Sequence, residues 1–188
     1  MENKENIITK ALGWIKSHIA IVSVALVVII ALIVCLSIFT GGPKKTVKKY
    51  VSALNKQDVE KVIECMDFAG EEAWGYYDID EFTAEDYAEF MQEYSNVDSE
   101  DVSYSRKWEL TSLTATFAEF KVEYKKFNVK IEEFKDVIEL GKDLYAVKAK
   151  VSVYAKPIDK EITEEIDETE IMTFIVYKNK IVDGDLYI

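Results

Sequence analysis

The longest hydrophobic stretch of the chain runs from Ile19 to Phe39, IAIVSVALVVIIALIVCLSIF, and contains no charged residue, Gly or Pro. As a helix rising about 1.5 Å per residue, these 21 residues would cross a bilayer core of about 30 Å. A single helix would also pair its backbone polar groups where lipid offers no water. The pattern predicts a membrane-spanning helix over residues 19–40, after a tail of residues 1–18 and before a domain of residues 41–188.

Two other interpretations of this N-terminal stretch fit the residues less well. A cleaved signal peptide has an apolar region of about 7–15 residues and small residues at its cleavage site. Here the apolar run is longer and ends in Ser37-Ile38-Phe39. A lipoprotein needs a small residue before its modified cysteine, whereas Val34 precedes Cys35. We therefore expect an uncleaved anchor and a single-pass protein of the cell membrane.

The orientation of this anchor depends on the lysines on its two sides. They are Lys4, Lys10 and Lys16 before it, and Lys44, Lys45, Lys48 and Lys49 after it. A bare count of positive charge places the domain in the cytoplasm. The later lysines, however, belong to a predicted domain helix, and the short tail can stay behind while a domain crosses the membrane. We expect an extracellular domain.

Three later segments place apolar residues at the i, i+3, i+4, i+7 spacing of an amphipathic helix. The first starts at Pro43, which suits the first turn of a helix. The second follows Asp58, a good N-cap, and the third follows Thr83, which forms a capping-box pattern with Asp86. The apolar positions are Val47, Tyr50, Val51 and Leu54, then Val59, Val62, Ile63 and Met66, then Tyr87, Phe90, Met91 and Tyr94.

Residues 106–126 fit both a helix and a strand. One helix face would hold Leu110, Leu113, Phe117, Phe120 and Tyr124. An alternating strand would instead use Phe120, Val122 and Tyr124. The length of the segment and its lack of Gly and Pro favour a helix.

The rest of the chain alternates as strands do. Turns at Gly141-Lys142-Asp143, Lys156–Asp159 and Lys178-Asn179-Lys180 separate runs of alternating residues, and one face of the run at 145–153 is apolar. This one-sided pattern is typical of an antiparallel sheet packed on helices. The sequence therefore predicts an α+β domain after the transmembrane helix.

A family resemblance points to the same fold. The stretch PKKTVKKYVSALNKQDVEKVIECMD, residues 43–67, resembles the opening of small bacterial domains in the nuclear transport factor 2-like, or cystatin-like, superfamily. It is most similar to membrane-anchored versions of unknown function. The resemblance implies a cone-shaped domain in which a curved antiparallel sheet wraps around long helices. It also supports an extracellular domain.

Charge and residue types exclude several functions. The formal charge of the chain is −12, and the residues after the tail carry −13, from 20 basic and 33 acidic side chains. Such an acidic surface argues against nucleic acid as a partner and against a domain that lies flat on anionic lipid. The only histidine, His18, precedes the domain, so a His-based triad, zinc site or general base is excluded there. Enzymatic members of the superfamily usually place Asp and His in the cone.

Neither a metal nor a cofactor is expected. Acidic residues crowd at Asp78, Asp80, Glu81, Glu85 and Asp86, and again at Asp183 and Asp185. Neither group has the spacing and glycine of a calcium loop. No base accompanies Cys65, and no catalytic motif occurs.

Three hypotheses about function follow. The first is a non-catalytic envelope module that binds a small ligand or a protein. Its pocket would lie at the open end of the sheet and be lined by aromatic rings, the candidates being Tyr50, Trp74, Tyr76, Tyr77 and Trp108. For the rings in the irregular, acidic stretch 67–82, we favour a plug at the end of the core. The alternatives are an enzyme that uses carboxylates and tyrosines in the cone, and a structural protein that forms a homodimer across the open sheet face.

Overall fold

The computed structural model describes residues 42–75 and 77–184, which belong to one compact unit that begins at Gly41. The predicted tail and membrane segment, and the candidate ring Tyr76, lie outside the described residues. Within the described ranges, every helix is too short or too polar to cross a membrane.

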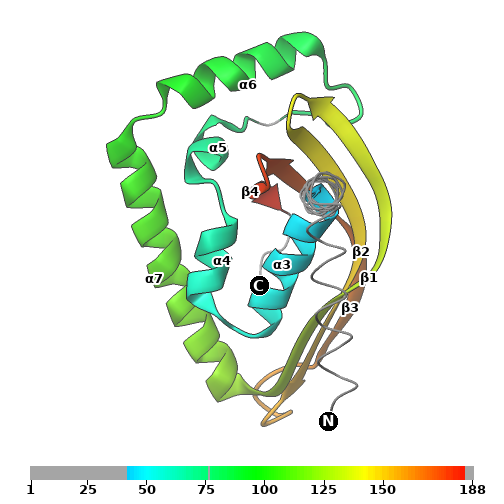
Figure 1. The fold of residues 1–188 in the computed structure, drawn as a ribbon. Helices are drawn as coiled ribbons and strands as arrows, with labels where there is room; N and C mark the ends of the chain where they lie inside the picture. The colour runs from blue at the N-terminus through cyan, green and yellow to red at the C-terminus, as the bar shows by residue number, and fades with distance from the viewer. Residues whose placement is uncertain (1–41, 76, 185–188) are drawn as a thin grey trace, which may run out of the picture. The chain divides into compact units, whose positions relative to one another are not determined.

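The described residues form an α+β domain, as the sequence predicts: helices come first and an antiparallel sheet follows (Figure 1). The helices are α3 (Pro43–Asn55), α4 (Val59–Cys65), α5 (Phe68–Ala73), α6 (Ala84–Asn96) and α7 (Ser99–Glu123). The strands are β1 (Tyr124–Gly141), β2 (Leu144–Pro157), β3 (Ile166–Tyr177) and β4 (Lys180–Gly184).

Local capping explains where the helices begin. Pro43 occupies the first turn of α3, and the Asp58 side chain accepts a hydrogen bond from the Lys61 backbone N–H at the start of α4. Thr83 and Asp86 form the complete capping box of α6. These three predictions are confirmed. Such caps satisfy backbone donors that the first turn of a helix cannot pair internally.

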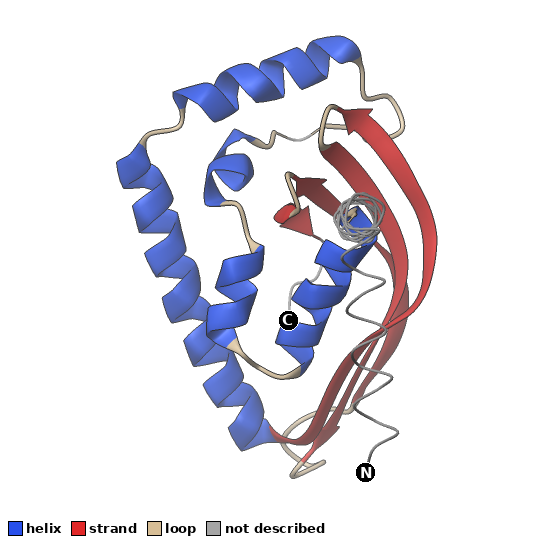
Figure 2. Ribbon diagram, in the orientation of Figure 1, coloured by secondary structure: helices blue, strands red, loops and turns tan. Residues whose placement is uncertain are grey.

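The four strands lie in sequence order, and each pairs antiparallel with the next. The sheet is long and curved, and α3 lies against its concave face (Figure 2). Tight turns join β1 to β2 and β3 to β4 through residues with positive φ, namely Asp143 at 61°, Lys178 at 46° and Asn179 at 63°. Asp and Asn tolerate this left-handed conformation better than most residues.

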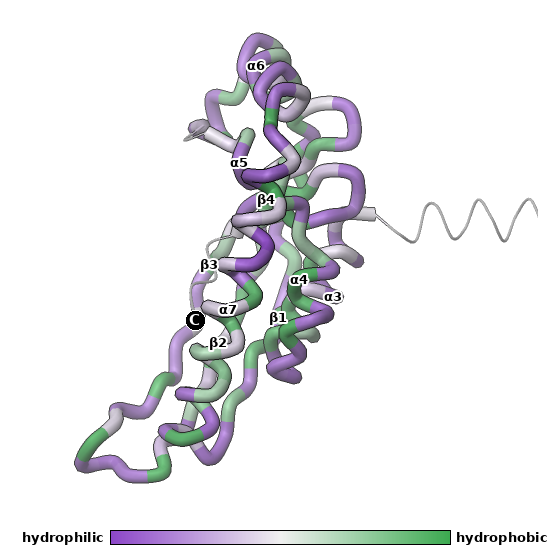
Figure 3. Tube along the Cα trace, turned by 90° about the vertical axis from the view of Figure 1, so that its left-hand side faces the viewer, coloured by the Kyte–Doolittle hydropathy of each residue, from purple (hydrophilic) through white to green (hydrophobic). Residues whose placement is uncertain are grey.

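The core has two parts. In the first, the apolar stripe of α3 packs on the sheet, where Val47, Leu54, Val147 and Phe174 are inaccessible or nearly so. In the second, Phe90 of α6 packs on Tyr177 of β3, with ring centroids 5.4 Å apart. Along the backbone, hydrophobic and hydrophilic positions are interspersed through the helices and strands (Figure 3).

Two segments differ from the sequence prediction. The stretch 67–82 is not irregular throughout, since Asp67 caps the short helix α5. The helix predicted over 106–126 begins earlier, at Ser99, and gives way to strand β1 at Tyr124. The residues that fit both a helical and a strand pattern therefore lie at a helix-to-strand junction. At this junction Phe120 and Tyr124 stack with ring centroids 5.0 Å apart.

Candidate functional site

A cavity of about 270 Å³ is bounded by α3, α5, α7 and β4. Its apolar wall includes Leu54, Met66, Leu113 and Ile181. Seven further lining residues carry polar or aromatic groups: Tyr50, Glu71, Trp108, Glu109, Ser112, Thr116 and Asp183. An apolar pocket with a few polar groups is the usual form of a small-molecule site.

The close approach of α5 to β4 depends on Gly70. A Cβ at this position would lie 2.7 Å from Cγ2 of Val182, closer than side-chain packing allows. Asp67, the N-cap of α5, also donates its backbone N–H to the Ile181 carbonyl at 2.7 Å. These contacts hold Glu71 of α5 and Asp183 of β4 at the same cavity.

Two aromatic residues differ sharply in their exposure. Tyr50 is 8% exposed and meets Phe174 edge-on, with ring centroids 6.3 Å apart. Burial raises the pKa of Tyr50, and the carboxylates of Glu109 and Glu71 raise it further. Trp108 of α7 is 61% exposed, although it also lines the cavity. The site therefore joins a buried phenol to an indole that solvent reaches.

The carboxylates give the cavity its electrostatic character. Partial burial raises the pKa of Glu71 to about 7, and the nearby charges of Glu109, Glu72 and Asp183 add to the effect. Burial also raises the pKa of Glu109. Desolvation and like charges both disfavour an ionised carboxyl, and a positive charge placed in the cavity would favour the ionised forms of Glu71 and Glu109.

A smaller hollow of about 160 Å³ continues from the cavity along α7. It shares Glu71, Trp108 and Glu109 with the cavity and adds Tyr104 and Ser105. Tyr104 is 72% exposed, and the Ser105 hydroxyl donates to a carboxylate oxygen of Glu72. The site thus opens to solvent beside two exposed aromatic rings.

The sequence-predicted rings divide into two groups. Tyr50 and Trp108 line the cavity. Trp74 and Tyr77 do not; they pack on each other with centroids 5.1 Å apart and belong to the second part of the core with Phe82 and Phe90. Their positions match the interpretation of these rings as a plug of the core.

The sequence analysis missed Glu71 and Glu109 as site residues. A signal was present on α7, where one helical stripe joins aromatic, acidic and hydroxyl side chains to apolar ones: Ser105, Trp108, Glu109, Ser112, Leu113 and Thr116. Polar residues on the inner face of a helix point to a solvated space rather than a packed core. For Glu71, the local sequence FAGEEA gives no comparable signal.

Metal ligation is not supported by the described part of the chain, since His, Cys, Asp and Glu side chains there form no group of three or more able to hold an ion. Comparison of the chain with family models, curated proteins and solved structures finds no match. The chemistry of the cavity must therefore be judged from its own residues.

Proposed function

We propose that this protein is a non-catalytic, membrane-anchored module of the cell envelope whose domain binds a small organic cation in the cavity beside Tyr50. The observation that carries the proposal is the convergence of Glu71, Glu109 and Asp183 from three separate elements on one hollow that two aromatic rings also line. The predicted span over 19–40 supplies the anchor, and the domain faces the outside. A cone of the nuclear transport factor 2-like kind would place such a hollow at its open end.

The lining residues favour a cation over a neutral or anionic ligand. A ligand ammonium group would relieve the mutual repulsion of Glu71 and Glu109 and replace part of their lost hydration. The Trp108 indole offers an aromatic face, which attracts cations through its quadrupole. The volume lies just below the ~300–1,000 Å³ of typical drug-sized sites, so the ligand is small.

One observation favours an enzyme as a second candidate. A carboxyl with a pKa of about 7 beside a buried tyrosine is suited to proton transfer at neutral pH. Under this alternative, Glu71 would act as a general acid or base on a substrate bound against Tyr50. The domain still lacks histidine, so both proton-transfer roles would fall on carboxyl and phenol groups.

Titration calorimetry of the full chain in detergent tests the proposal with a panel of small alkylammonium ions and alcohols of the same shape. We expect binding of ammonium ligands and at least tenfold weaker binding of the matched alcohols. Glu109→Gln should weaken ammonium binding about tenfold, equal to about 1.4 kcal/mol. Glu119→Gln, an exposed carboxyl of the same helix outside the cavity, is the matched control.

The two candidates separate in the same samples. A binding module leaves the ligand chemically unchanged after prolonged incubation, as mass spectrometry would show. Turnover that falls after Glu71→Gln, with a pH profile centred near 7, would replace the module by the enzyme. Equal affinity for ammonium ions and alcohols would refute the cation site.

A further inference from the structure

A second hollow of the domain carries the opposite charge. It is a wide groove of about 710 Å³ formed by α3, α4 and the first residue of β4, and we call it the lysine groove. Six lysines line it: Lys45, Lys48, Lys49, Lys56, Lys61 and Lys180. Glu64 is the one acidic residue in its lining. Six of the 20 basic residues after the tail therefore meet here, in a part of the chain with a formal charge of −13.

These lysines are largely free of carboxylate partners. Within the described ranges, Lys61 pairs with Asp58, whereas Lys45, Lys49, Lys56 and Lys180 form no ion pair. All six lining lysines are exposed. In an acidic domain, carboxylates are plentiful enough to neutralise a basic groove, so its unpaired charge is a distinct feature of this surface.

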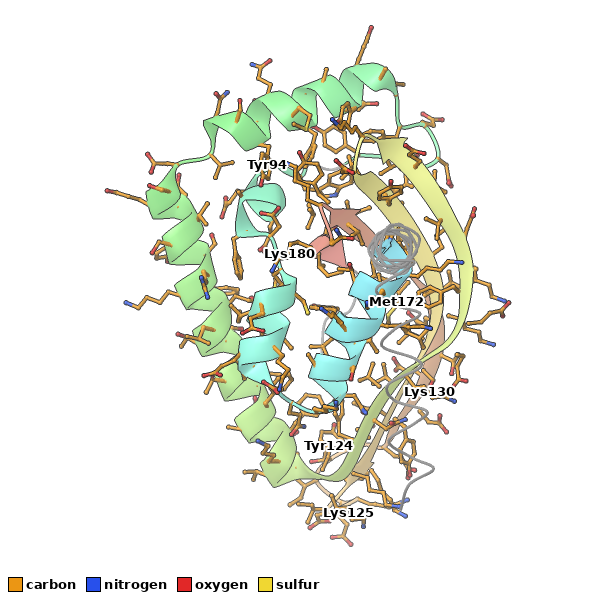
Figure 4. All side chains as sticks on the ribbon, viewed as in Figure 1. Tyr94, Tyr124, Lys125, Lys130, Met172 and Lys180 are labelled. Carbon is orange, nitrogen blue, oxygen red and sulfur yellow. The ribbon has the colours of Figure 1, made fainter. Side chains whose placement is uncertain are left out.

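Hydrogen bonds to backbone carbonyls hold together the elements that form the groove. The Lys180 ammonium donates to the Glu64 carbonyl, which ties the start of β4 to α4 (Figure 4). The Lys56 N–H closes the end of α3 on the Ser52 carbonyl at 3.3 Å, and the Gln57 turn then returns the chain toward α4. Charges from three elements thus converge around one concavity.

The position of the lysine groove in the chain indicates its partner. Only residues 40–42 separate Phe39, the last residue of the hydrophobic stretch, from Pro43 at the start of α3. Six residues extend at most about 21 Å, so Lys45 is tethered within that distance of Phe39. Lysines at such positions are attracted to anionic headgroups, each by about fivefold in partitioning.

We propose that the lysine groove binds the phosphate groups of anionic phospholipids in the membrane that anchors the protein. This inference rests on the anchorage in the proposed function but not on the cation cavity. Lysine ammonium groups bind phosphate as point charges without fixed geometry, which suits a mobile headgroup. The groove has a volume of about 710 Å³, which is far more than a single enclosed ion needs and leaves room for headgroups.

Lysine acetylation of the full chain in lipid nanodiscs, read by mass spectrometry at low conversion, tests the inference. One arm uses phosphatidylcholine alone, and a second adds 30% phosphatidylglycerol. A third arm adds 10 mM glycerol phosphate to the first. We expect at least threefold slower acetylation of Lys45, Lys49, Lys56 and Lys180 in the second arm only. Lys125, Lys126 and Lys150, which are exposed on β1 and β2, should react at one rate in all arms.

High salt should restore the acetylation rates, because it screens exposed charges. Equal groove rates with and without phosphatidylglycerol would overturn the inference. Equal protection by glycerol phosphate would also overturn it and assign the groove to a soluble phosphate ligand.

Vesicle flotation distinguishes failure of the groove from failure of the anchor. The quadruple variant Lys45→Gln, Lys49→Gln, Lys56→Gln and Lys180→Gln is compared with Lys125→Gln, Lys126→Gln, Lys150→Gln and Lys156→Gln. Both variants lose four positive charges. If the chain inserts, both float with neutral vesicles. If it does not insert, two results together support the inference. The control variant floats with anionic vesicles only, and the groove variant floats with neither kind of vesicle. Absence of flotation with either vesicle overturns it.

Discussion

At the scale of single residues, Glu71 is the most informative side chain of the domain. Its carboxyl is not deeply buried, yet partial desolvation and the neighbouring acids raise its pKa from 4.5 to about 7. A group that binds its proton more tightly in the folded state lowers the stability of that state once the pH is high enough to remove the proton. The ionised Glu71 carboxylate in the cavity therefore lowers the stability of the folded state at neutral pH.

The Glu71→Gln variant tests this cost. Because the folded pKa is raised, the destabilisation is absent below pH 4.5 and complete above pH 7. Solvent exposure screens the effect, so we expect the variant to gain about 1 kcal/mol in unfolding free energy at pH 8. At pH 4.5 the gain should vanish. Urea unfolding of the full chain in detergent measures both values, and a gain that is independent of pH would contradict the assignment.

At the scale of elements, the cavity depends on how closely α5 approaches β4. Gly70 permits this approach, because a methyl group there would collide with the Val182 side chain. The two ends of the contact lie far apart in the sequence but adjoin Glu71 and Asp183 in space. Packing at one glycine therefore controls the spacing of two acidic groups.

Gly70→Ala should separate α5 from β4 and destabilise the domain by about 1–3 kcal/mol, the usual range for overpacking. Ammonium binding should weaken along with stability. The matched control is Ala69→Gly in the same short helix, which removes a methyl group instead of adding one. Thermal unfolding and calorimetry on both variants give the comparison. An unchanged affinity in a destabilised Gly70→Ala chain would show that the spacing does not matter.

Elements with local signals could be predicted from the sequence. Of the site, the sequence indicated only the aromatic residues. Pro43, Asp58 and Thr83 mark helix starts through their own chemistry, and alternation from Phe127 onward marks the strands. Tyr50 and Trp108 were accessible as aromatic candidates. Glu71 carries no local signal, because it is one carboxyl among many, and Glu109 shares the polar and aromatic stripe of α7 but meets Glu71 only when α7 packs against α5.

At the scale of the whole molecule, a predicted membrane anchor precedes a domain of uneven charge. The acidic residues dominate the count, while six lysines gather in the lysine groove next to α3. With this division of charge, one domain carries both the proposed cation cavity and the proposed lipid-binding groove. Electrostatic attraction of this kind weakens as ionic strength rises.

The anchor itself is testable in cells. The full chain should remain in the membrane pellet after alkaline carbonate extraction, because about 20 apolar residues make insertion effectively irreversible. Protease added to intact cells should remove the domain and leave the tail. Deletion of residues 19–40 should release the protein into the soluble fraction. A domain protected from protease until the cells are lysed would reverse the proposed orientation.

Fluorine NMR directly tests whether a small cation binds beside Trp108. The chain has three tryptophans, so 5-fluorotryptophan labelling gives three signals, and Trp108→Phe assigns the relevant one. Titration with an alkylammonium ion should shift the Trp108 signal alone, the alcohol of the same shape should leave it in place, and Glu109→Gln should suppress the shift. A Trp108 signal that stays fixed at saturating ammonium, or that moves equally with the alcohol, would contradict the account.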